Sequence, residues 1–293
     1  MKNGWKFAQH ARVALLFSLA LLVGCAPAET PVPVKQPVDE TSVPAAPSPS
    51  QDLPPTNADP AQIWVRPVDG MVMVYIPAGE FIMGSDAGEN NERPAHPVYL
   101  DAYWIDQTEV TNAMYLTCVE AENCSPPPDR AYLDDPAYAQ HPAVYLDWDA
   151  AQNYCRQTGG RLPTEAEWEK AARGTDGRTY PWGESIDCEK ANFGRCVDDT
   201  TPVGSYEAGR SPYGLYDMAG NVWEWTADWY GVHVYETPPA INPTGAESGL
   251  FHTLRGGSWL TGDWNARTTD RYVDDVPLLR NEIGFRCVIS VGE

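Results

Sequence analysis

The residue types best suited to chemistry gather near the C-terminal end of the chain, between residues 254 and 271. Aromatic faces and guanidinium groups recognise peptides or sugars at a low entropic cost, so tryptophans and arginines here are candidates for lining a ligand-binding cleft. The alternative is that the tryptophans belong to the core and the arginines join loops. The candidate cleft residues are Ser258, Trp259, Trp264, Arg267 and Arg271.

Redox metals need donor sets that this sequence does not readily offer. A Cu(I) site needs a pair of soft thiolates, and no cysteine lies between Cys196 and Cys287. A non-haem iron site needs two histidines and a carboxylate, and the histidines are scattered, as surface or loop histidines are. We therefore expect neither copper nor iron as a cofactor. The four histidines after the predicted signal peptide are His96, His141, His233 and His252.

The N-terminus carries the pattern of a secretory signal. Basic residues precede an apolar run from Val13 to Val23, which is too short to span a bilayer as a stable helix. The run ends in Leu22-Val-Gly-Cys25, which resembles a bacterial lipobox. We predict a lipoprotein signal peptide over residues 1–24, lipidation of Cys25, and membrane anchoring on the extracytoplasmic side of a bacterial cell envelope. The alternative is an ordinary signal peptide with an incidental cysteine.

Composition divides the rest of the chain in two. Residues 25–62 are rich in proline and lack aromatic residues, so they cannot bury enough apolar surface to offset their ordering entropy, and we predict a disordered tether. Residues 63–293 have the length of one sizeable domain. The formal net charge of −21 repels nucleic acid, so no nucleic-acid partner is expected.

The seven cysteines suit an oxidising compartment. If Cys25 carries lipid, the other six can pair evenly. Short spacing favours the pairs Cys118–Cys124 and Cys188–Cys196, which leaves Cys155 and Cys287. Other pairings stay open at this point.

Turn and cap residues mark the elements of the domain. Thr164 and Glu167 fit a capping box at the start of a helix, and Gly174 ends it. From about residue 179 the sequence is rich in glycine, proline and aromatic residues, which predicts short strands and long ordered loops. The other expected elements are two short strands within 71–84, a strand over 98–106, and helices over 111–120 and from Asp147 to Gly159.

Several motifs in order carry a family resemblance. The chain contains Arg161-Leu-Pro-Thr-Glu-Ala-Glu-Trp-Glu169, Gly220-Asn-Val-Trp-Glu-Trp225, Gly256-Gly-Ser-Trp259 and Gly284-Phe-Arg-Cys287. Together they resemble the sulfatase-modifying-factor family, whose best-known members are formylglycine-generating enzymes, from about residue 71 to 287. The resemblance implies an α+β, C-type-lectin-like fold with few helices, short strands and much irregular loop. It also implies a disulfide between Cys155 and Cys287.

The same resemblance bears on function. In the oxidases of the family two copper-binding cysteines stand where this chain has Thr261 and Ala266. We therefore expect a domain that binds a protein, peptide or glycan without formylglycine chemistry, and leave enzymatic activity open. The alternative is a formylglycine-generating-type oxidase, or a related non-haem metal oxidoreductase, that acts on protein or small thiol substrates.

Calcium is the cofactor that the resemblance implies. Carboxylates and backbone carbonyls are suitable calcium ligands, and the segment Asp217-Met-Ala-Gly-Asn-Val-Trp-Glu224 aligns with one that binds calcium in relatives. This gives the side chains of Asp217 and Glu224 and the backbone oxygens of Gly220 and Val222 as ligands. A helix-cap and turn cluster is the alternative. A second site at Asn192 and the carbonyl of Phe193 matches only in part.

Overall fold

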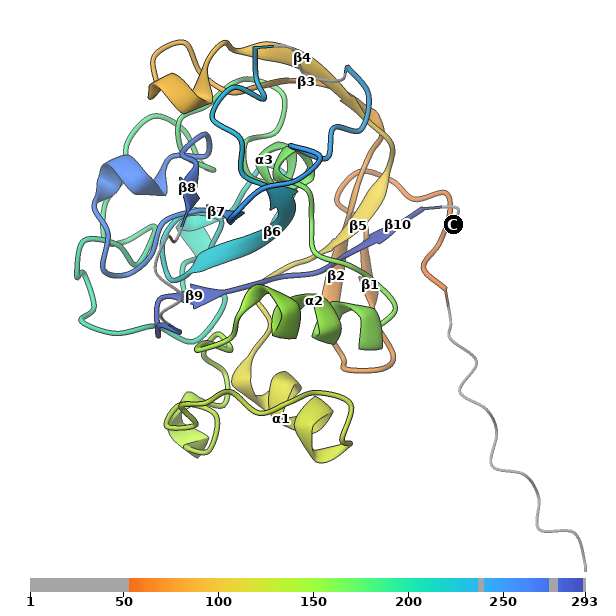
Figure 1. Cartoon of the computed structure of the whole chain (residues 1–293), viewed down its shortest axis with the longest axis vertical. Helices are drawn as coiled ribbons and strands as arrows, with labels where there is room; N and C mark the ends of the chain where they lie inside the picture. The colour runs from red at the N-terminus through yellow and green to blue at the C-terminus, as the bar shows by residue number, and fades with distance from the viewer. Residues whose placement is uncertain (1–52, 237–239, 274–278, 292–293) are drawn as a thin grey trace, which may run out of the picture. The chain divides into compact units, whose positions relative to one another are not determined.

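The structure, a computed structural model of the chain, describes residues 53–236, 240–273 and 279–291 (Figure 1). The predicted signal peptide over 1–24, the lipidation site Cys25 and residues 25–52 of the predicted tether lie outside the described residues. Within the described part, no helix combines the length and the apolar character needed to cross a membrane.

A four-stranded sheet joins the beginning and the end of the domain, in the order β1-β2-β5-β10. All its pairings are antiparallel. Both faces are covered: Met73 and Trp104 belong to one core cluster, and Val74 and Ile105 to another. This explains why β2 and β5 are apolar on both sides. The strands are β1 (Ile63–Val65), β2 (Val72–Ile76), β5 (Tyr103–Asp106) and β10 (Val288–Ser290).

Two smaller sheets complete the strand structure. The antiparallel pair β3 (Gly79–Met83) and β4 (His96–Leu100) forms one. The other has the order β8-β7-β6-β9, in which β6 and β9 are parallel. Its strands are β6 (Trp223–Trp229), β7 (His252–Arg255), β8 (Tyr272–Val273) and β9 (Ile283–Gly284).

Three α-helices begin at side-chain caps, as the sequence predicts. They are α1 (Asn112–Glu120), α2 (Trp148–Gln157) and α3 (Glu165–Arg173), capped by Thr111, Asp147 and Thr164. The predicted capping box at α3 is present. Short 3-10 turns lie in the loops: η1 (Asn90–Glu92), η2 (Pro136–Tyr138), η3 (Glu207–Gly209) and η4 (Asp263–Ala266). Few helices, short strands and long loops make this the expected α+β fold.

All nine residues of α3 are buried, although five of them are charged. The helix packs against β3, β4, β6 and β7, and Figure 1 shows it in the interior of the domain. Arg173 pairs with Glu169 within the helix, and the other charges are matched by groups outside it. Glu165 pairs with Arg271 and Glu169 with Arg255, and the Lys170 ammonium donates to the carbonyls of Pro77 and Gly79.

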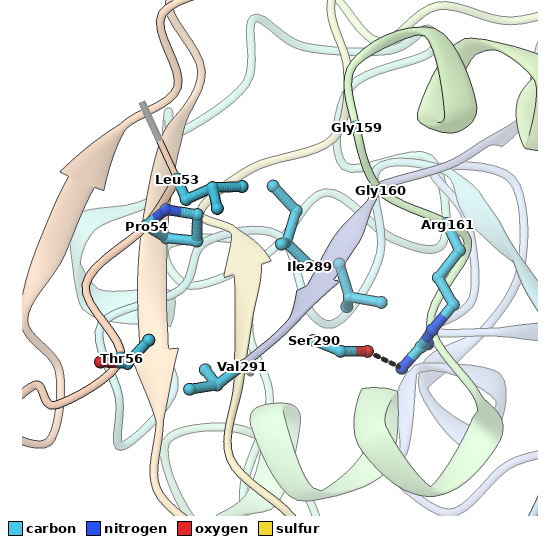
Figure 2. Close-up of a pocket in the computed structure, with 10 residues that line it drawn as sticks. Leu53, Pro54, Thr56, Gly159, Gly160, Arg161, Ile289, Ser290 and Val291 are labelled. Carbon is cyan, nitrogen blue, oxygen red and sulfur yellow. Dashed lines mark hydrogen bonds between the residues drawn. The ribbon is translucent and has the colours of Figure 1, made fainter. Parts of the chain in front are cut away.

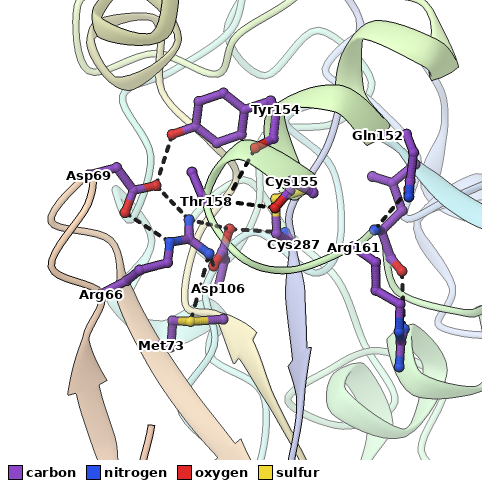
Figure 3. Close-up of a disulfide and its surroundings, with 11 residues drawn as sticks. Arg66, Asp69, Met73, Asp106, Gln152, Tyr154, Cys155, Thr158, Arg161 and Cys287 are labelled. Atoms are coloured by element: carbon purple, nitrogen blue, oxygen red, sulfur yellow. Dashed lines mark hydrogen bonds and ion pairs between the residues drawn. A yellow bond between two sulfur atoms is a disulfide. The ribbon is translucent and has the colours of Figure 1, made fainter. Parts of the chain in front are cut away.

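The structure contains the three disulfides expected from the sequence, Cys118–Cys124, Cys155–Cys287 and Cys188–Cys196. The second ties α2 to the residue before β10, in a buried polar surrounding (Figure 3). There Asp106 accepts hydrogen bonds from the Cys287 N–H and from Arg66. Burial raises the pKa of Asp106 to about 6, although Arg66 opposes the shift.

The domain begins before the predicted boundary at residue 63. Pro54 is buried, the Pro55 carbonyl accepts a hydrogen bond from the Trp104 indole at 3.1 Å, and Ala61 N–H donates to Tyr75 at 3.2 Å. The last residues assigned to the tether therefore pack on the first sheet, because Trp104 offers them an apolar surface and a buried N–H donor.

Candidate functional site

The segment after β7 folds into a tight double-glycine turn. Gly256 and Gly257 have φ values of 97° and 75°, which favour glycine. A side chain at Gly257 would meet the Asn265 carbonyl oxygen at 2.9 Å. The turn then closes on itself, because Ser258 N–H donates to the Thr261 hydroxyl at 2.8 Å and that hydroxyl donates to the Ser258 carbonyl at 3.2 Å.

Thr261 and Ala266 both make contacts that hold the local structure of this segment. The Thr261 hydroxyl is used by Ser258, as above, and Ala266 is fully buried in a small cluster with Tyr180 and Ala219. Neither residue carries a thiol. The six cysteines of the described residues are all in disulfides, so the donor set present here does not fit Cu(I), which wants thiolates.

Ser258 and Trp259 are interior residues, and their side chains donate hydrogen bonds to residues 281 and 282. Ser258 is fully buried and its hydroxyl donates to Glu282 at 2.9 Å. Glu282 also pairs with Arg280 at 3.2 Å. Trp259 is 7% exposed, and its indole N–H donates to the Asn281 carbonyl at 3.4 Å.

The two arginines proposed for the cleft are also interior, which corrects that expectation. Arg267 is buried against Glu92 at 2.7 Å and Arg271 against Glu165 at 3.0 Å. The physical reason is that both carboxylates are themselves buried and need a charged partner. Of the five candidates, only Trp264 is substantially accessible, at 48%. Ser258, Trp259, Trp264, Arg267 and Arg271 therefore do not line one open surface.

Glu224, expected as a calcium ligand, is occupied by other partners. One carboxylate oxygen accepts from Arg286 Nε at 2.7 Å and from the Trp168 indole at 2.8 Å, and the other accepts from Arg286 at 2.7 Å. The ion pair is fully buried. This carboxylate does not fit a cation, because Arg286 already neutralises it.

Asp217 lies instead beside a carboxylate that the sequence analysis missed. Glu109 is fully buried; one of its oxygens accepts from the Asn221 side chain at 3.0 Å, and the other has no hydrogen-bond partner among the described residues. Burial, then the Asp217 charge, raises the pKa of Glu109 well above its usual value. Burial likewise raises the pKa of Asp217 to about 6, although its bond from Gly204 N–H at 2.6 Å opposes this.

The predicted calcium ligands Asn192, Phe193 and Gly220 are engaged in other contacts. The Asn192 amide is used on both sides, donating to the Asp199 carbonyl and accepting from Val197, and the Phe193 carbonyl accepts from Cys196 N–H. Gly220 is packed closely, since a side chain there would meet the Asn192 carbonyl oxygen at 2.3 Å. The described ranges contain no group of three or more His, Cys, Asp or Glu residues placed to hold a metal ion.

The histidines also have separate environments. Their ring nitrogens contact different groups, and the ring of His252 lies stacked between Trp148 and Trp229 at 3.9 and 3.8 Å between centroids. Burial lowers the pKa of His252. The other contacts are His96 to the Pro94 carbonyl, His141 to Thr200 and His233 to Glu236.

Comparison with known proteins places these features in a family. A model described as "Sulfatase-modifying factor enzyme 1-like domain" matches residues 60–291. The formylglycine-generating enzyme of Streptomyces coelicolor is 32% identical over 83% of this chain and 95% of its own length. The serine/threonine-protein kinase pkn1 of Chlamydia caviae is 40% identical over 75% of this chain, but the match spans only 38% of that protein. Among solved structures, PvdO from Pseudomonas aeruginosa superposes with a TM-score of 0.69 at 27% identity, over 80% of this chain and 100% of PvdO.

Proposed function

The chain belongs to the family of sulfatase-modifying factor enzyme 1-like domains, and from that premise we propose that it is a lipoprotein, anchored to the membrane of a bacterial cell envelope, whose domain binds a protein, peptide or glycan partner without formylglycine chemistry. One observation carries the proposal. All six cysteines of the described residues are in disulfides, and the family resemblance implies that Thr261 and Ala266 stand at the two copper positions. The described residues therefore offer no free thiolate pair of the kind that holds Cu(I).

The test measures metal content and oxygen use together. We expect the purified full chain, loaded with Cu(I), to retain less than stoichiometric copper and to consume no oxygen with a cysteine-containing peptide. The matched variant, Thr261→Cys with Ala266→Cys, restores the thiol pair and should bind copper more tightly. Stoichiometric copper and peptide-dependent oxygen uptake by the unaltered chain would contradict the proposal.

Membrane anchoring rests on the Leu22-Val-Gly-Cys25 sequence. We expect the mature chain to incorporate labelled fatty acid and to partition into detergent. Cys25→Ser should abolish both, and Cys25→Ser protein that is still labelled would show that the anchor is elsewhere.

Calcium is the cofactor we propose for the domain, held by Asp217 and Glu109 in place of Glu224. The support is a pair of buried carboxylates, one of whose oxygens has no hydrogen-bond donor among the described residues. Calcium is a hard cation that takes carboxylate oxygens, and it would neutralise this pair. Titration calorimetry should detect calcium binding to the unaltered chain and a weaker signal for Glu109→Gln. Equal calcium binding by both proteins would place the ion elsewhere.

A further inference from the structure

The last strand of the first sheet has one edge that is only partly paired. Along β10, the Cys287 carbonyl accepts from Asp106 N–H and the Val291 N–H donates to Ala102, so these residues bond toward β5. Val288 bonds the other way, exchanging two hydrogen bonds with Arg161 at 3.0 and 2.8 Å. Because hydrogen-bonding direction alternates along a strand, the Ser290 N–H and C=O point to the same outer edge as those of Val288.

A turn at Gly159 ends the outer pairing before it reaches Ser290. In the antiparallel register set by Arg161 and Val288, residue 159 would stand opposite residue 290. Gly159 instead has a φ of 84° and donates its N–H to Arg156, which carries the chain back into α2. No hydrogen bond to the Ser290 backbone on this edge occurs among the described residues. The strand therefore presents one open rung.

A cavity lies against this rung on each face of the sheet. The first, of about 230 Å³, is on the face where Ile289 packs with the Trp104 cluster. Figure 2 shows Leu53 and Pro54 on one side of it, Gly159 to Arg161 on the other, and Ile289 to Val291 between them. Leu53 is 72% exposed, so this cavity offers an apolar wall.

The second cavity, of about 380 Å³, lies on the opposite face and is more polar. It is lined by Asp101, Thr164, Glu167, Asn242 and Ser290, among others. Arg161 borders both cavities, and its guanidinium bonds to Glu167 at 2.7 Å and to the Ser290 hydroxyl at 3.1 Å. The lining contains two carboxylates, those of Asp101 and Glu167, and one guanidinium, so this cavity has a net negative charge.

We propose that an extended peptide segment of a partner protein adds to β10 at Ser290. Consecutive side chains of an added strand point to opposite faces, so neighbouring residues of the ligand enter the two cavities. Backbone bonds to an open sheet edge supply affinity, and the flanking pockets supply selectivity. The first cavity favours an apolar side chain and the second a basic one, which makes the recognised class an extended segment with adjacent apolar and basic residues. This inference rests on the binding role proposed above and moves it away from Ser258 and Trp259.

The test uses a phage-displayed library of random dodecapeptides on the immobilised full chain. Ser290→Pro removes the outward N–H and leaves the bonds to β5 intact, since proline is tolerated where a strand N–H faces outward. Ser290→Ala is the matched control, because it removes the hydroxyl but keeps the N–H. We expect selected peptides with adjacent apolar and basic residues to bind Ser290→Pro at least about tenfold more weakly than the other two proteins. In the unaltered chain, the same peptides should slow exchange of the Ser290 amide hydrogen, a measurement that holds even if Ser290→Pro fails to fold.

The outcomes separate this inference from the binding role itself. Selected peptides that bind Ser290→Pro as well as the unaltered chain, or leave the Ser290 amide unprotected, overturn the β10 site and keep a binding function at another surface. A library that yields no binding peptide overturns the peptide inference, whereas a glycan or folded-protein ligand would still satisfy the proposed function.

Discussion

Replacing Glu109 by glutamine should make the protein less sensitive to alkaline pH. In the folded chain burial and the Asp217 charge keep Glu109 protonated well above its usual pKa, whereas in the unfolded chain it ionises near 4.5. Between the two pKa values the folded state therefore holds one more proton than the unfolded state. The stability that this proton contributes is fully present below the pKa of the unfolded chain and is lost progressively as the pH rises to the pKa of the folded chain. The slope is about 1.4 kcal/mol per pH unit for one proton. A glutamine at this position has no titratable proton to lose, so this contribution to the pH dependence is absent from Glu109→Gln.

Urea unfolding at about pH 5.5 and about pH 7.5 measures the effect. Relative to Glu109→Gln, the unaltered chain should lose stability between these two conditions in calcium-free buffer, at no more than about 1.4 kcal/mol per pH unit, the slope of one proton. Calcium should restore part of that loss in the unaltered chain only, because the ion replaces the proton. Glu120→Gln, at an exposed position at the end of α1, is the matched control. A free-energy difference between the unaltered chain and Glu109→Gln that stays constant with pH would refute the reasoning.

Two further predictions concern stability. Arg267→Ala leaves Glu92 buried without its guanidinium partner, so we expect the free energy of unfolding in urea to fall by about 3 to 5 kcal/mol. The exposed Arg195→Ala is the control and should change it little. An unchanged unfolding midpoint for Arg267→Ala would contradict a structural role and favour a ligand-binding one. Removing the Cys155–Cys287 disulfide by a double alanine substitution should lower the free energy of unfolding by about 5 kcal/mol, and removing Cys188–Cys196 by about 2.5 kcal/mol, because the loops span 132 and 8 residues. Equal losses from the two pairs would contradict the loop-entropy argument.

Local signals in the sequence predicted local structure well. Thr111, Asp147 and Thr164 each cap a helix close to where a helix was expected to begin, since a cap needs only the next few residues. The pairs Cys118–Cys124 and Cys188–Cys196 follow from short spacing in the same way. The Cys155–Cys287 bond needed the family resemblance, because 132 residues separate its partners.

The candidate cleft residues do not share an open surface, because Arg267 and Arg271 pair with carboxylates that lie far away in the sequence. Glu92 lies 175 residues before Arg267, and Glu165 lies 106 residues before Arg271. No pattern near residue 258 announces either carboxylate. Glu109 was missed for a related reason, since its burial beside Asp217 arises only when the loop after β5 meets the loop before β6. The residue types alone gave no sign of that meeting.

The burial of α3 has a consequence for how functions are assigned across the family. Its motif, Arg161-Leu-Pro-Thr-Glu-Ala-Glu-Trp-Glu169, is one of the strongest marks of resemblance, and Glu165, Glu167 and Glu169 in it are engaged in internal bonds. Replacing Glu165 or Glu169 would leave a buried arginine without its partner, so folding alone suffices to retain these two residues. A match to the family therefore does not require the reactive residues, and the replacement we propose at Thr261 and Ala266 is compatible with it. Such a match detects the residues that determine the fold of the domain. The chemistry must be inferred separately, from the residue at each position of the site.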